Sequence, residues 1–197
     1  MEHSNRFFKT ACLFEASLIV VAVLLGWIAD IDPFATLYFS ESAIAIGIVG
    51  TLPLLLLFLS LEYLSQKSVV DIRNLLLKTL APSLHQRHWT DLLLLATIAG
   101  VSEELLFRGV IQPWITASWG IIAGLWVSNI IFGLVHAVTP LYALLVTFVG
   151  LYLSLSMEVG VGENNLLIPI IIHSLYDFLA FIALMRMYRA SLLEHNE

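Results

Sequence analysis

The distribution of apolar residues is the feature that most constrains the fold of this chain. Of its 197 residues, 59% are hydrophobic and 12% are charged, and the mean hydropathy is +0.92. About 20 apolar residues are enough for an α-helix to cross the hydrocarbon core of a bilayer. Six segments approach that length: residues 11–29, 42–64, 91–112, 120–139, 141–157 and 166–188. A water-soluble globule is therefore excluded, and we expect an all-α, polytopic membrane bundle of about six transmembrane helices.

The basic residues predict how this bundle is oriented. Apart from Arg108, which lies inside a predicted span, they precede the first span, separate the second from the third, or follow the last. Six spans place these three regions on one side of the membrane, and Lys and Arg are enriched in cytoplasmic loops. Both termini are therefore expected in the cytoplasm. The connections on the other side carry only acidic charges: Asp30, Asp32, Glu41, Glu158 and Glu163.

The whole chain, residues 1–197, is predicted to form a single membrane domain, because no internal repeat or long linker interrupts it. The sizeable loop at residues 65–90 mixes aliphatic and basic residues, which predicts an amphipathic helix that ends before Pro82. Such a helix lies either on the membrane surface or against the bundle. The net charge of −6 offers no basic face, so we expect the lipid bilayer as a partner and no nucleic acid.

Ionisable side chains are concentrated in three of the predicted spans. Charged groups in a hydrocarbon core are costly, so they are functional candidates. Glu15 and Glu62 lie near span ends and are expected at the membrane interface. The residues inside the third, fourth and sixth spans are Glu103, Glu104, Arg108, His136, His173 and Asp177.

Helical spacing assigns different roles to these residues. Glu104 and Arg108 are four positions apart and can pair, whereas Glu103 points about 100° away and has no cation one turn away on its helix. A desolvated carboxylate without a cation can serve as a general base. His173 and Asp177 also share a helical face, so the acid can orient the imidazole. The alternative is that these charges only hold helices together.

Two neighbours of His136 are candidates for site support. Phe132, one turn earlier, is expected to pack against the imidazole, and Asn129 either supports the site or bonds to a neighbouring helix. The predicted boundaries place Glu103 and His173 near mid-membrane but His136 close to the cytoplasmic end of its span. The sequence alone does not bring His136 to the other two.

Three motifs occur in order on separate spans: Glu-Glu-x-x-x-Arg at 103–108, Phe-x-x-x-His at 132–136 and His-x-x-x-Asp at 173–177. Over residues 90–182 the pattern resembles the CPBP family, which groups CAAX-processing prenyl proteases with bacterial Abi proteins linked to bacteriocin processing or self-immunity. The resemblance implies an intramembrane endopeptidase in a bacterial inner (plasma) membrane. Its expected substrate is a membrane-associated peptide or protein.

The resemblance also implies roles for individual residues. Glu103 would activate the attacking water with His136, while His173 and the residue at position 177 would stabilise the oxyanion. Family members commonly have Asn at this last position, whereas Asp177 donates a hydrogen bond only when protonated. We therefore expect Asp177 chiefly to orient His173.

Alternatives to a metal-free protease stay open. Two histidines and a glutamate form an acceptable zinc set, so Glu103, His136 and His173 would be the metal ligands of a metalloprotease. Because the chain has no His-Glu-x-x-His helix, we favour a glutamate mechanism without a cofactor. A non-catalytic immunity or scaffold protein could bind a peptide at the same site. A haem-binding carrier and a proton-coupled transporter are the remaining alternatives.

Overall fold

The structure is a computed structural model that describes residues 2–159 and 164–194, so Glu163 lies outside the described residues. Within these ranges the chain is helical and contains no strand. Four described helices are long and apolar enough to cross a membrane: Ser4–Ala29, Glu41–Glu62, Pro140–Val159 and Leu167–Leu193. The protein is an all-helical integral membrane protein. The predicted number of six spans stays a prediction.

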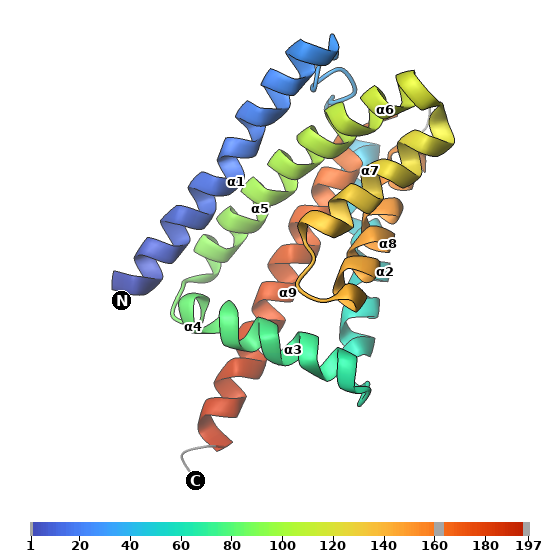
Figure 1. Ribbon diagram of the computed structural model, residues 1–197. Helices are drawn as coiled ribbons and strands as arrows, with labels where there is room; N and C mark the ends of the chain where they lie inside the picture. The colour runs from blue at the N-terminus through green and yellow to red at the C-terminus, as the bar shows by residue number, and fades with distance from the viewer. Residues whose placement is uncertain (1, 160–163, 195–197) are drawn as a thin grey trace.

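The helices form a bundle around two central members, α5 and α9 (Figure 1). Their bounds in chain order are α1 (Glu2–Ala29), α2 (Glu41–Glu62), α3 (Lys67–Thr79), α4 (Ala81–Leu84), α5 (Trp89–Leu106), the π-helix η1 (Phe107–Ile111), α6 (Gln112–Trp119), α7 (Ile121–Val135), α8 (Pro140–Ser156), the short 3-10 helix η2 (Met157–Val159) and α9 (Leu167–Glu194).

The third predicted span is longer in the structure than in the sequence analysis. Instead of residues 91–112, a nearly continuous helical stretch joins α5, η1 and α6 and ends at Trp119. Gly120 follows with φ at 86° and ψ at 166°, a positive-φ conformation that glycine adopts without steric cost. The chain then reverses into α7.

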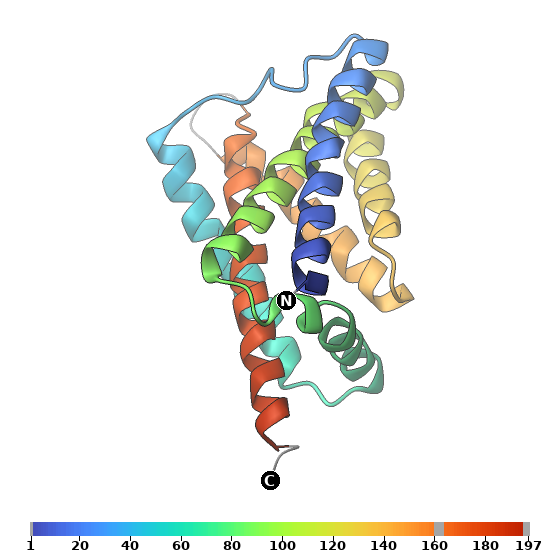
Figure 2. The ribbon, with the colours of Figure 1, turned by 90° about the vertical axis from the view of Figure 1, so that its left-hand side faces the viewer.

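The fourth predicted span, residues 120–139, is shorter in the structure. α7 ends at Val135, and α8 begins at Pro140, where the Thr139 side chain accepts a hydrogen bond from the Tyr142 backbone nitrogen at 3.1 Å. Proline at the first helical position suits this start because its missing N–H has no intrahelical partner there. The α7–α8 turn consequently lies at the level of the middle of α9 rather than at the end of the bundle (Figures 1 and 2).

Close packing between α5 and α9 depends on a small residue. A Cβ atom on Gly100 would lie 2.9 Å from the backbone nitrogen of Ser174, which is closer than real Cβ contacts. Glycine at this position therefore lets the two central helices approach. This approach places the third motif, on α9, against the first motif, on α5.

The predicted amphipathic helix is α3, and it ends before Pro82, as expected. Its residues Leu76, Leu77 and Leu80 pack with α9, so the helix lies against the bundle, while Pro82 opens the short helix α4. The start of α1, α3, α4 and the end of α9 lie toward the same end of the molecule (Figures 1 and 2). The basic residues other than Arg108 are therefore gathered at that end, as the predicted orientation requires.

The orientation predicts how two engineered cysteines should behave. In a background in which Cys12 is replaced by Ser, Thr36→Cys lies in the α1–α2 connection and Lys78→Cys lies on the exposed side of α3. A membrane-impermeant maleimide added to intact cells should label position 36, and position 78 only after permeabilisation. Labelling in the reverse order would show that the termini lie outside.

Candidate active site

The three motifs meet around Glu103, which is buried near the C-terminal end of α5. Its Oε2 atom lies 3.5 Å from Nε2 of His136, at the end of α7, and 3.9 Å from Nε2 of His173, on α9. No described residue forms a hydrogen bond to this oxygen. The structure thus brings together a buried carboxylate and two imidazoles from three separate helices.

His136 reaches this site because α7 ends four residues before the predicted boundary. The expected position of His136 near the cytoplasmic end was therefore wrong. Its backbone leaves the helix with φ at −94° and ψ at 3°, and its Nδ1 lies 2.8 Å from the Phe132 carbonyl oxygen. As a donor to that carbonyl, Nδ1 carries the proton, and Nε2 faces Glu103.

Phe132 packs between both histidines, as its predicted supporting role requires. The Phe132 ring centroid lies 4.6 Å from that of His136 and 6.2 Å from that of His173. The Arg108 guanidinium lies over the same ring, 4.7 Å from its centroid. Phe132 therefore limits the rotation of both imidazoles and separates the reactive side of the site from its ionic support.

His173 contacts an acid at each ring nitrogen. Its Nδ1 donates to Oε1 of Glu104 at 2.8 Å, while its Nε2 lies 3.6 Å from Oδ2 of Asp177, the predicted partner on α9. Glu104, on the neighbouring helix, therefore orients the imidazole together with Asp177. The reason is tertiary. Close packing of α5 on α9 brings Glu104 to Nδ1 of His173, and Asp177, one turn after His173, reaches Nε2.

The predicted pair between Glu104 and Arg108 is confirmed by a distance of 2.9 Å between Oε1 and Nη1. Arg108 is buried and also donates from Nη2 to Asn129 Oδ1 at 2.9 Å and to the Gly150 carbonyl at 2.6 Å. Its Nε donates to Ser154 Oγ at 3.3 Å. Arg108 thus ties α5, α7 and α8 together, and Asn129 supports it from α7.

Two parts of this support were not found in the sequence. Arg108 belongs to the π-helix η1, whose wider turn interrupts the helical ladder, a feature that is frequent at functional sites. Gly150 and Ser154 on α8 carry no charge and occupy an ordinary apolar helix, so no sequence signal singles them out. Their contribution depends on which face α8 turns toward α7.

Glu15 was expected at the membrane interface, and the structure corrects this. α1 begins at Glu2, nine residues before the predicted span, so Glu15 lies midway along the helix. Its Oε2 is buried without a hydrogen-bond partner among the described residues. The carboxyl is close enough to interact with the charges of Glu103, Asp177, His136 and His173. A fourth acid, on α1, therefore lies within electrostatic range of the site.

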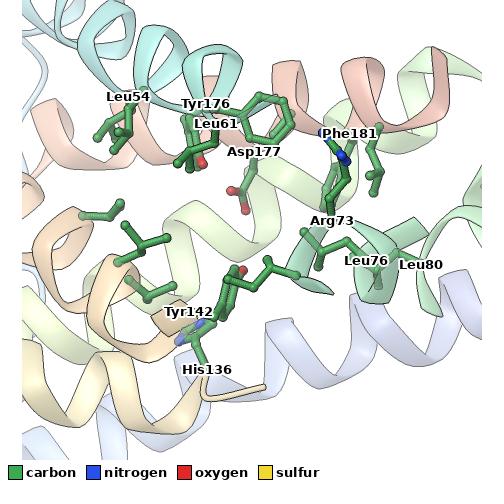
Figure 3. A pocket seen from close by; sticks show the side chains of 18 of the residues that line it. Leu54, Leu61, Arg73, Leu76, Leu80, His136, Tyr142, Tyr176, Asp177 and Phe181 are labelled. Carbon is green, nitrogen blue, oxygen red and sulfur yellow. The ribbon is translucent and has the colours of Figure 1, made fainter. Parts of the chain in front are cut away.

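A cavity of about 260 Å³ extends from the polar residues toward α3. Figure 3 shows the Asp177 carboxylate and the Tyr142 ring directed into this space, with His136 at one end and Arg73 on the side of α3. Most of the wall is apolar and comes from α2, α3, α8 and α9, with Phe58, Leu76, Leu145, Val149 and Phe181 as examples. The arrangement suits an apolar ligand whose reacting group lies at the polar end.

The predicted zinc set was compared with the geometry of the described residues. Within them, no three His, Cys, Asp or Glu side chains form a group that could hold a metal ion. The positions of these side chains therefore lend no support to Glu103, His136 and His173 as zinc ligands.

Comparison with known proteins bears on this site directly. A family model described as type II CAAX prenyl endopeptidase Rce1-like matches residues 85–179, which contain all three motifs. Residues 85–179 are thus similar to the Rce1-like family. The match confirms the resemblance and supports a CAAX-type intramembrane protease. No curated protein and no solved structure matches the chain.

Proposed function

We propose that this Rce1-like protein is a glutamate-type intramembrane endopeptidase of a bacterial inner membrane, with Glu103 as its general base. The observation that carries the proposal is the environment of Glu103. Its Oε2 is buried, has no hydrogen-bond partner among the described residues and lies 3.5 Å from His136 Nε2 at the polar end of an apolar cavity. A carboxylate in this setting is poised to take a proton.

The first chemical step requires a water between Glu103 and His136. Because His136 donates from Nδ1 to Phe132, its Nε2 can accept one water hydrogen while Glu103 accepts the other. The lone pair of that water oxygen then attacks the scissile carbonyl carbon as Glu103 takes the proton. Glu103 next returns the proton to the leaving nitrogen as the C–N bond breaks, so the step needs no external acid.

The second requirement is a donor for the tetrahedral oxyanion. His173 Nε2 faces the cavity between Glu103 and Asp177, and it donates to the oxyanion when that nitrogen carries a proton. Glu104 and Arg108 act as positioning residues because Glu104 holds His173 through Nδ1 and Arg108 holds Glu104. Asp177 and Tyr142 are further polar groups that line the cavity.

The apolar wall favours a hydrophobic or lipid-modified substrate segment, and the family description points to prenylated CaaX peptides. The proposal is tested with purified full-length protein in liposomes, an S-farnesylated peptide that ends in a CaaX sequence, and mass spectrometry of the products. Wild-type protein should release a C-terminal fragment, and Glu103→Gln protein should not. Binding of the peptide without any hydrolysis would instead favour an immunity or scaffold protein.

Chelation provides a separate test of the catalytic type. We expect hydrolysis to persist after exhaustive chelation, and metal analysis to find less than stoichiometric zinc, because the proposed steps use only side chains and water. The measurement is the rate before and after chelation in the same preparation. Loss of activity that added zinc restores, and other divalent ions do not, would contradict the glutamate mechanism.

Asp177→Asn should have a small effect on the reaction. Asn keeps an acceptor near His173 Nε2 and adds an amide donor at the cavity end, where the wild-type side chain lies 3.6 Å from that nitrogen. We expect kcat/KM to change by less than about tenfold, or ~1.4 kcal/mol in the barrier, with an unchanged melting temperature. A loss as large as that of Glu103→Gln would assign Asp177 an ionised catalytic role.

A further inference from the structure

We propose that Arg73 binds the C-terminal carboxylate of the substrate peptide and thereby positions the scissile bond at Glu103. The inference rests on the proposed protease function and names a recognition group that the three motifs do not contain. It concerns the end of the cavity formed by α3, away from the histidines.

Arg73 differs from the other basic residues in its surroundings. It is partly buried on α3, and it is the single Lys or Arg among the described residues that line the cavity. Its Nη1 donates to the Glu62 backbone carbonyl at 2.8 Å, and no described carboxylate forms an ion pair with its guanidinium. Arg108, in contrast, has Glu104 as a counter-ion. The Arg73 guanidinium therefore has donors left for an anion in the cavity.

The chemistry of a CaaX substrate calls for such a cation. The CaaX sequence is C-terminal, so an endopeptidase that cuts there works a few residues from a free carboxylate. Burying that carboxylate beside apolar walls is costly unless a cation or several donors meet it. A guanidinium offers two parallel N–H donors that match a carboxylate.

The spacing between the two ends of the cavity agrees with this role. Leu76 and Leu80, which follow Arg73 on α3, pack in one apolar cluster with Phe181 of α9. Phe181 comes eight residues after His173 on α9. At ~1.5 Å per residue, the end of the cavity near α3 therefore lies about 12 Å from the histidine. An extended peptide advances roughly 3.3 Å per residue, so about three or four residues cover the gap.

A purely structural role for Arg73 predicts something different. Glu62 is the last residue of α2, so the bond to its carbonyl also caps that helix. Loss of this cap would weaken the binding of all substrates equally, whatever their C-terminal group. The Glu62 side chain lines the same cavity and carries the opposite charge, so Glu62→Gln should strengthen binding of a carboxylate rather than weaken it.

The test compares an S-farnesylated CaaX peptide as the free acid with the same peptide as its C-terminal amide, on full-length protein in liposomes. Wild-type protein should prefer the acid in kcat/KM by about tenfold or more, as expected for a charge-assisted hydrogen bond. Arg73→Gln should bring the acid-to-amide ratio close to one, and Arg73→Lys should keep part of it. Lys78→Gln, on the exposed side of the same helix, is the matched control and should leave the ratio unchanged.

A binding measurement separates this inference from the proposed function. Fluorescent acid and amide peptides are titrated into Glu103→Gln protein with intact Arg73 and with Arg73→Gln. If wild-type protein cleaves neither peptide, the protease proposal fails, but stronger binding of the acid through Arg73 still supports the inference. Equal binding of the acid and the amide overturns the inference. Binding of anionic lipid that is lost in the Arg73→Gln protein would instead assign Arg73 to a headgroup phosphate.

Discussion

Glu103→Gln should yield a folded protein that no longer cleaves its substrate. Glutamine keeps the volume of the side chain but cannot take a proton from water, so we expect the rate to fall by about 10²- to 10⁴-fold. Stability should change little because the Oε2 atom forms no hydrogen bond with a described residue. The measurements are initial rates of peptide hydrolysis and melting temperatures in detergent.

Glu158→Gln is the matched control, since Glu158 is exposed on η2 and lines no part of the cavity. It should retain both the wild-type rate and the wild-type melting temperature. A Glu103→Gln protein that still cleaves at more than about a tenth of the wild-type rate would lie outside the range expected for loss of a general base. That result would remove Glu103 from the mechanism.

Arg108→Ala should reduce stability and activity together. Removing the guanidinium leaves Glu104 buried without its cation and deprives Asn129, Gly150 and Ser154 of a hydrogen bond each. Breaking a buried ion pair on one side costs about 3–5 kcal/mol, so we expect a lower melting temperature in detergent and poor expression. Activity should fall even in the folded fraction because Glu104 no longer holds His173.

Two further variants show whether the charge or the shape of Arg108 matters. Arg108→Lys keeps a cation beside Glu104 but lacks the planar fork that reaches several acceptors, so its stability should be intermediate. Lys78→Ala removes an exposed basic residue and should leave the melting temperature unchanged. A stable Arg108→Ala protein without activity would contradict the structural role and leave Arg108 with the positioning of Glu104 alone.

Much of the fold class was predictable because lipid restricts the choice of backbone structure. In a bilayer every backbone polar group must be paired, so long apolar segments fold as helices whatever their neighbours. The pairing of Glu104 with Arg108 was equally local, because residues four apart share a helical face. The α3 helix and its end before Pro82 followed from similar short-range rules.

Helix ends inside the bundle were not predictable in the same way. Residues 136–139 include Ala137 and Val138 and contain no helix breaker before Pro140, so the fourth span was extended to Thr139. The backbone turns earlier, where His136 bonds to the Phe132 carbonyl and meets Glu103 across the site. Both contacts stabilise that turn, but the contact with Glu103 forms only when α5 is in place.

The sequence by itself therefore determined the membrane class, the three motifs and the local ion pair, since each depends on hydrophobicity or on one helical turn. The tertiary structure decided which groups meet: Glu104 on α5 bonds to His173 on α9, and Glu15 on α1 lies within electrostatic range of the site. These relations depend on how far one helix rotates and slides against another. Such rotation and sliding are set by small residues like Gly100, whose effect appears only when two helices pack.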